Sequence, residues 1–269
     1  MTNIFLRSII FFEKVRLLFT LVDLKSEKKS RFQHLADYFR KADIEFQKIT
    51  LPSGESFYQC KSGLYRGKIP WKLITEKAPF KAFILPFDSE DESAPLQFEP
   101  KILPQKMLLN TAIDYMKKLN FSPSGTHLTI VDKKGLHLEK IPELIKLASL
   151  ITVVTNKTEE YTLLSEKLFD SYGISLMLRR TYSETGRENS FLFDFDGEDI
   201  PLSYKGIAFS KEKKHLLNGK TMIPGGFELP TEYEGLWQKN TDKLQFASAL
   251  YELCGVRELQ NLRFNELCS

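Results

Sequence analysis

The sequence is poor in cysteine and histidine, and neither residue occurs in the spacing of a metal site. Its three cysteines, Cys60, Cys254 and Cys268, form no CxxC pair, and its four histidines form no HxxxH or HExxH pattern. An odd number of widely spaced cysteines argues against a disulfide framework and favours reduced thiols in the cytoplasm. The sequence therefore gives no support to a metal centre.

Two common catalytic motifs and a membrane span are also missing. Neither a GxSxG nucleophile turn nor a GxxxxGK[ST] phosphate loop occurs, which excludes the commonest hydrolase and P-loop explanations. The apolar residues 4–24 are interrupted by Arg7, Glu13, Lys14 and Arg16, so no run approaches the ~20 uncharged residues of a transmembrane helix. We expect a cytoplasmic protein without a membrane partner.

The chain has little net charge for its length. Lysine and arginine number 38 against 35 acidic residues, and the formal charge is +3. No global field points toward nucleic acid, so we expect no nucleic-acid partner. With 269 residues, of which 42% are hydrophobic, the chain can bury one large core or two of ordinary size.

What the sequence does contain is an alternation of strand and helix patterns between residues 126 and 180. Short β-branched runs at residues 127–132, 150–155 and 174–178 are separated by helical patterns, the second of them at residues 158–172. Parallel neighbours need a crossover long enough to hold a helix, so this spacing predicts βαβ units. The predicted fold class is α/β, with a Rossmann-like three-layer parallel or mixed sheet preceded by a small α+β unit.

The predicted domains are residues 1–90, a small α+β unit, and residues 101–269, a Rossmann-like domain with a C-terminal helix. The acidic, proline-containing residues 88–103 are the predicted boundary. In the first unit we expect a helix at residues 30–39 and an antiparallel pair, residues 57–60 and 63–66, with its turn at residues 61–62.

Beyond the βαβ region, helix 158–172 is expected to begin at a capping Thr158 and to turn Phe169 and Tyr172 toward the sheet. Residues 211–240 are rich in turn-forming residues and predict an extended loop. The C-terminal helix is expected to be capped by Thr241 and to end at Gly255.

The candidate binding residues lie where the predicted parallel strands end. Asp132 follows the first strand, and Thr155, Asn156, Lys157 and Thr158 follow the second. Open α/β sheets bind ligands at this edge. Asp132 also has a structural interpretation, in which its carboxylate accepts hydrogen bonds from the loop amides of Lys134 or Gly135, as aspartate commonly does in turns.

Residues 151–161 resemble the second strand and turn of the Rossmann domains of shikimate dehydrogenase and glutamyl-tRNA reductase. In those families an Asn-Arg-Thr triplet helps to hold the adenosine end of NADP, and Asn156-Lys157-Thr158 occupies that place here. Asn156 follows Asp132 by 24 residues, near the ~20 expected between phosphate turn and ribose position. The resemblance covers residues 124–180 and implies NADP as cofactor. Only Gly135 is available for the glycine-rich phosphate turn.

A second motif, at residues 191–198, places Asp194, Asp196 and Gly197 after an apolar run. It resembles the first motif of haloacid-dehalogenase-like phosphohydrolases, in which the first aspartate attacks phosphorus and both help to bind magnesium. Glu198 stands in place of the threonine of that family. A plain turn after a strand is the alternative interpretation.

Three functional hypotheses stay open. The first is a protein whose Rossmann-like cleft binds a small ligand or nucleotide through Asp132, Gly135 and residues 155–158, without established catalysis. The second is an NADP-dependent oxidoreductase with an atypical phosphate turn. The third is a protein-interaction or structural module that uses the aromatic-rich N-terminal unit and residues 218–237. The pattern does not decide whether the protein is an enzyme, or identify a partner or an oligomeric state.

Overall fold

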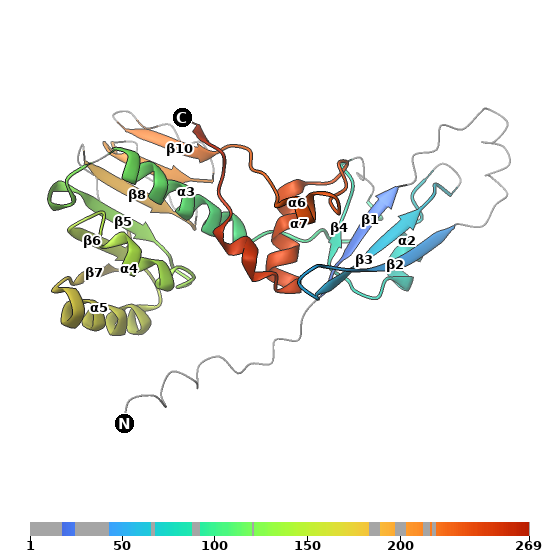
Figure 1. Cartoon of the computed structure of the whole chain (residues 1–269), viewed down its shortest axis with the longest axis horizontal. Coiled ribbons are helices and arrows are strands. Elements are labelled where there is room, and N and C mark those ends of the chain that lie inside the picture. Colours follow the sequence, from blue (N-terminus) through green and yellow to red (C-terminus); the bar gives the residue numbers. More distant parts are fainter. Residues whose placement is uncertain are drawn as a thin grey trace, which may run out of the picture. The chain divides into compact units, whose positions relative to one another are not determined.

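The computed structural model describes residues 18–24, 43–65, 68–87, 92–119, 121–182, 189–196, 203–211, 216 and 219–268. The chain divides into two compact units (Figure 1). One contains residues 1–103 and 229–259, and the other contains residues 104–228 and 260–269. The predicted second domain, residues 101–269, includes residues 229–259, whereas in the structure these residues belong to the first unit. The helix expected at residues 30–39 lies outside the described residues.

The first unit is built on a four-stranded mixed sheet with the order β2-β3-β1-β4. Strand β1 (Thr20–Leu24) runs parallel to both of its neighbours, β3 (Ser56–Ser62) and β4 (Phe83–Ile84). Strand β2 (Ile44–Thr50) pairs antiparallel with β3 along its whole length. The unit is therefore an α+β structure, as its sequence predicts.

The hairpin of this unit lies one strand earlier than expected. Lys61 and Ser62 do not form a turn, because both lie inside β3 and pair with β2. The turn is at residues 51–55, where Gly54 has φ +89° and the Leu51 amide bonds the Glu55 carbonyl. Glycine adopts positive φ at no steric cost, whereas Lys61-Ser62 offers no such residue. The predicted turn at residues 61–62 was wrong.

Helix α7 (Lys243–Ala249) begins at Asp242, whose carboxylate accepts a hydrogen bond from the Gln245 amide. Thr241 is not the cap, because its hydroxyl donates instead to the Gln238 carbonyl. The helix continues as a π-helical turn (Leu250–Cys254) and ends at Gly255, with φ +87°, as predicted.

Aromatic side chains join α7 to the sheet of the first unit. The Phe19 and Phe57 rings stack with their centroids 4.8 Å apart, and Phe246 of α7 meets both rings edge-on. All three side chains are buried, so this cluster anchors residues 229–259 in the first unit. The same unit contains α2 (Trp71–Lys77) and α6 (Thr231–Glu234).

The second unit contains a seven-stranded sheet in the order β11-β10-β9-β8-β5-β6-β7. Every neighbouring pair is parallel except β10 and β11. Its strands are β5 (His127–Val131), β6 (Leu150–Val154), β7 (Leu176–Arg179), β8 (Ser190–Asp194), β9 (Ile207–Ser210), β10 (Lys220–Pro224) and β11 (Leu267–Cys268). The predicted Rossmann-like α/β fold is confirmed.

The strand order identifies the place where this sheet is doubly wound. Counted from β5, the six parallel strands have the spatial order 3-2-1-4-5-6, which is that of dinucleotide-binding folds. The chain leaves β5 toward β6 and β7 on one side, then returns to β8 on the other. The switch point therefore lies at the carboxyl ends of β5 and β8.

The helices of this unit differ greatly in length. Helix α3 (Leu103–Leu119) precedes β5, and α5 (Thr158–Tyr172) joins β6 to β7. Between β5 and β6 the crossover has only a 3₁₀ turn (Leu138–Lys140) and α4 (Ile141–Leu144), with Pro142 in the first helical turn. No helix within the described ranges is long and apolar enough to cross a membrane.

Helix α5 has the predicted extent but not the predicted details. Its N-cap is Lys157 and no side chain caps it, so the role assigned to Thr158 was wrong. Tyr161 and Leu168 are buried, but Phe169 and Tyr172 are 58% and 60% exposed and do not face the sheet. The helix ends at Gly173, with φ +69°.

Residues 211–240 are not simply an extended loop. They include β10, which pairs parallel with β9, and the short helix α6 of the first unit. Strand β10 follows Gly219 directly and ends at Pro224, and these turn-forming residues hide a short strand near the sheet edge in the sequence pattern.

Candidate functional site

The candidate site lies at the switch point of the second unit. Asp132 directly follows β5, Asp194 ends β8 and pairs with Val131, and Asp196 follows two residues later. Open α/β sheets bind their ligands in the crevice at this position. The burial and hydrogen bonding of these carboxylates therefore determine whether a ligand can bind at the carboxyl ends of β5 and β8.

Asp132 is buried, and its two carboxylate oxygens accept three hydrogen bonds. The Leu136 amide donates to Oδ1 at 2.9 Å, the His137 amide donates to Oδ2 at 2.8 Å, and the Tyr161 hydroxyl donates to Oδ2 at 2.7 Å. Only 1% of the residue is exposed. This network fits the structural interpretation of Asp132, although the donors are Leu136 and His137 rather than the nearer amides of the turn.

Tyr161 reaches Asp132 from the first turn of α5. Burial raises the pKa of the Tyr161 phenol far above its ordinary value, and the neighbouring Asp132 carboxylate raises it further. The phenol therefore keeps its proton and remains a hydrogen-bond donor. A buried carboxylate is stabilised by donors of this kind, which replace the water it has lost.

His137 is buried between Gln105 and Phe195. Its Nε2 lies 3.1 Å from the Gln105 side-chain oxygen, and its ring centroid lies 4.0 Å from that of Phe195. An amide oxygen only accepts, so with this amide orientation Nε2 carries the proton and Nδ1 is the bare nitrogen. Nδ1 is buried without a hydrogen-bond partner. Burial lowers the pKa of His137 to about 4 against the opposing effect of Asp132, so the ring is neutral at pH 7.

Two further hydrogen bonds reach the segment after β8, one from the turn after β5 and one from α3. The Lys133 amide donates to Asp196 Oδ2 at 2.7 Å, and the Gln105 side-chain amide donates to the Phe195 carbonyl at 2.9 Å. Gln105 thereby links His137 to the backbone after β8. The polar groups around the switch point therefore form hydrogen bonds with one another, which leaves these groups fewer free donors for a ligand.

An ion pair between Lys106 and Glu139 lies beside this network. The Lys106 side chain is 8% exposed and its ammonium bonds the Glu139 carboxylate, whose side chain is 61% exposed. The hydrogen bond from Lys106 lowers the pKa of Glu139. Lys106 is thus neutralised at the surface end of the network.

The turns after β5 and β6 pack against each other. The Asn156 amide donates to the Lys133 carbonyl at 3.4 Å. Gly135 has φ +69°, and a Cβ placed on it would lie 3.1 Å from Cγ of Lys157. The Lys157 stem therefore lies directly on the Gly135 backbone, while its ammonium pairs with Glu160 at 3.5 Å.

The remaining candidate residues belong to the start of α5. Thr155 is buried, and its hydroxyl accepts a hydrogen bond from the Lys157 amide at 3.0 Å. Thr158 is the first residue of the helix, and Asn156 is exposed. The structure brings all six predicted residues to one edge of the sheet. Asp132 and Thr155 are buried there, Gly135 is half-buried, and Asn156, Lys157 and Thr158 are exposed.

This geometry does not fit a dinucleotide pyrophosphate at the turn after β5. Such a turn holds phosphate with backbone amides that point at the ligand. Here the Leu136 and His137 amides donate to Asp132, and Lys157 covers the face of Gly135. A buried carboxylate at the same amides would also repel a phosphate.

The second motif places Asp194 and Asp196 at the same edge, while Gly197 and Glu198 lie outside the described residues. Asp194 is buried at the end of β8, and Asp196 accepts the Lys133 amide. Across the described part of the chain, no group of three histidine, cysteine, aspartate or glutamate side chains is arranged to hold a metal ion.

Sequence reasoning missed Gln105, Tyr161 and Lys106 as members of this network. Tyr161 has the spacing of an apolar core residue, and its hydroxyl carries no separate signal in the pattern. Gln105 and Lys106 lie in the first turn of a helix whose register on the sheet is set by tertiary packing. The proximity of His137 to Asp132 was the one usable signal.

Comparison with known proteins identifies no relative from which a function could be inferred. No family model matches the chain, and no curated protein shows significant sequence similarity to it.

Proposed function

We propose that this α/β protein is non-catalytic and that the switch point of its Rossmann-like unit binds no nucleotide. Its switch point has become a buried polar network. One observation carries the proposal: both oxygens of Asp132 are occupied by donors from within the same unit. We further propose a cytoplasmic location, in keeping with the free thiols of its cysteines.

The protonation states of the network support this proposal. A general acid or base must reach its substrate and have a pKa near the working pH. His137 is 1% exposed with a pKa of about 4, and the Tyr161 phenol holds its proton. Neither group exchanges a proton readily with a bound substrate at neutral pH.

Melting curves with a nucleotide panel test this proposal. NADP, NAD, ATP and S-adenosylmethionine are each added at millimolar concentration. A ligand at about 100 times its Kd adds about 2.7 kcal/mol of stability, which is readily detected. We expect no shift of the melting temperature from any of the four.

A shift with NADP would contradict the proposal and favour the oxidoreductase hypothesis instead. In that case, replacing Asn156 and Lys157 by alanine should abolish the shift. Lys134→Ala, on the exposed side of the turn, is the matched control for loss of one positive charge. An unchanged shift in the double variant would place the NADP site elsewhere.

A protein-interaction function is the second candidate, and one surface favours it. Phe169 and Tyr172 lie three residues apart and so are neighbours on the surface of the end of α5, and each is more than half exposed. Contiguous exposed apolar side chains often mark interaction sites. Light scattering after size exclusion tests this function: a complex or oligomer that Phe169→Glu dissociates supports it, and a monomer without partners counts against it.

A further inference from the structure

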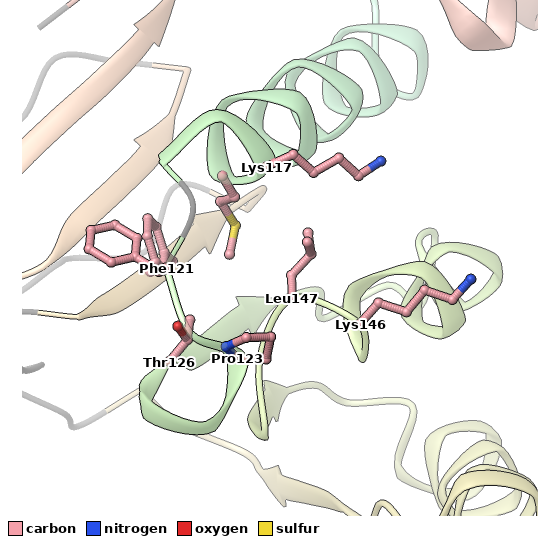
Figure 2. A pocket seen from close by; sticks show the side chains of 8 residues that line it. Lys117, Phe121, Pro123, Thr126, Lys146 and Leu147 are labelled. Carbon is pink, nitrogen blue, oxygen red and sulfur yellow. The ribbon is translucent and has the colours of Figure 1, made fainter.

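The second unit contains a cavity at the opposite ends of the strands from the polar network. It lies beside the amino end of β5, between the last turn of α3 and the turn after α4, and has a volume of about 260 Å³ (Figure 2). Protein interiors rarely leave voids much larger than a water molecule. The four-residue α4 covers little of the sheet here, so the cavity follows from the short crossover.

The walls of the cavity are apolar and partly aromatic. Met116 and Phe191 are buried, and the Phe121 ring lies against Phe191 with the centroids 5.7 Å apart. Phe121 itself remains 40% exposed, and Leu147 closes the other side. A flat apolar guest would cover the exposed phenylalanine face and gain edge or stacking contacts.

The rim of the cavity has an unbalanced positive charge. Glu143 pairs with Lys117 at 3.3 Å and with Lys140 at 3.7 Å. Lys146 makes no ion pair with any residue that the structure describes. In Figure 2, Lys117 of α3 and Lys146 of the turn after α4 lie on the Leu147 side of the cavity, across from Phe121, and their ammonium groups extend outward.

Little else in the cavity can recognise a polar group. The Thr126 hydroxyl lines it but donates to the Ser122 carbonyl. Lys117 already pairs with Glu143, so the Lys146 ammonium is the donor left for a ligand. Ammonium groups bind carboxylate or phosphate through charge-assisted hydrogen bonds.

The volume limits the size of a ligand. At ~30 Å³ for each water, a 260 Å³ cavity corresponds to roughly nine water molecules, below the usual range for sites of drug-sized ligands. A single aromatic ring with one charged substituent matches this space, whereas a dinucleotide does not.

We propose that this cavity binds a small aromatic monocarboxylate. The ring lies against Phe121 and Leu147, and the carboxylate pairs with the exposed Lys146 ammonium. This site shares no residue with the network around Asp132, so it stands or falls independently of the proposed absence of catalysis.

An NMR titration with benzoate and its neutral isostere benzamide tests the site. Each compound is added up to about 50 mM, which detects a Kd of millimolar order. We expect benzoate to shift the signals of Phe121, Leu147 and Phe191 saturably, and benzamide to bind at least about fivefold more weakly. Absence of saturable shifts with benzoate, or equal binding of the two compounds, would overturn the proposal.

Variants of exposed lysines separate a specific site from general attraction of anions. Lys146→Gln should weaken benzoate binding about fivefold. Lys118→Gln, in the last turn of α3 but not at the cavity, should leave it unchanged. An equal loss in both variants, or none in Lys146→Gln, would contradict the assigned role of Lys146. Leu147→Phe fills the cavity and should reduce binding further, and unaltered binding in that variant would also exclude the site.

Discussion

The Tyr161 hydroxyl donates a 2.7 Å hydrogen bond to Asp132, and both side chains are almost wholly buried. This bond joins the first turn of α5 to the residue that follows β5. It places a neutral phenol and two backbone amides around a carboxylate at the position where related folds hold a phosphate. The Asp132 carboxylate therefore occupies the amides that would otherwise be free to bind an external anion.

Tyr161→Phe should destabilise the protein by about 2 kcal/mol, because it leaves a buried carboxylate short of one donor. Urea unfolding measures this change as a lower midpoint. Tyr172→Phe removes the same hydroxyl from the exposed end of α5 and should stay within about 0.5 kcal/mol of the parent. Equal stability of the two variants would show that the phenol does not support Asp132.

His137 makes stability depend on pH in a defined direction. Its pKa is lowered from 6.5 in the unfolded chain to about 4 in the folded protein. The unfolded state therefore binds the proton more tightly than the folded state. The contribution of neutral His137 to the free energy of unfolding is complete above pH 6.5 and is lost as pH falls toward 4. The loss amounts to about 3 kcal/mol at most.

Unfolding by urea across this pH range should show a steeper loss in the parent than in His137→Gln, which carries no titrating group. Imidazole NMR signals give a direct check. A His137 titration near its unfolded value, or identical pH dependence of parent and variant, would contradict the burial of a neutral ring.

Gly135→Ala should destabilise the protein by about 1–3 kcal/mol, since it combines a positive φ with contact to the Lys157 stem. Gly173→Ala is a matched control, because Gly173 has the same φ of +69° but nothing within 4 Å of the added carbon. The stability that Gly135→Ala loses beyond Gly173→Ala measures the packing of the turn after β5 against the turn after β6. If the two variants lose equal stability in thermal unfolding, the turns are not in contact.

The three cysteines should react very differently with a thiol reagent. Cys60 and Cys254 are buried, and burial raises the pKa of the Cys60 thiol to about 12, whereas Cys268 is exposed. The thiolate is the reactive form, so we expect fast colour development equivalent to one thiol in the native protein and three after denaturation. Cys268→Ser should remove the fast phase, and a remaining fast phase would mean that Cys60 or Cys254 is accessible.

The sequence predicts the sheet of the second unit better than its site, for physical reasons. Parallel strands buried on both faces are short apolar runs, and the runs predicted at residues 127–132 and 150–155 exceed β5 and β6 by one residue each. The spacing also predicts that Asp132 and Asn156 share an edge. It does not predict that Tyr161 and Gln105 complete the site, because hydrogen bonds between distant residues leave no periodic signal.

Errors in the first unit have a different origin. Residues 61–62 look like a turn only when β3 is considered alone, and its antiparallel pairing with β2 decides otherwise. The place of residues 229–259 depends on packing of Phe246 against Phe19 and Phe57. Contacts over such sequence separations are tertiary information, which local propensity does not contain.

An amide NMR titration with NADP tests the central claim most directly, because the claim concerns the amides of Leu136 and His137. If these amides donate to Asp132, their signals should keep their positions at millimolar NADP and exchange slowly with deuterium. Saturable shifts of both signals, together with those of Asn156 and Lys157, would show that the turn opens to hold a phosphate and would contradict the account.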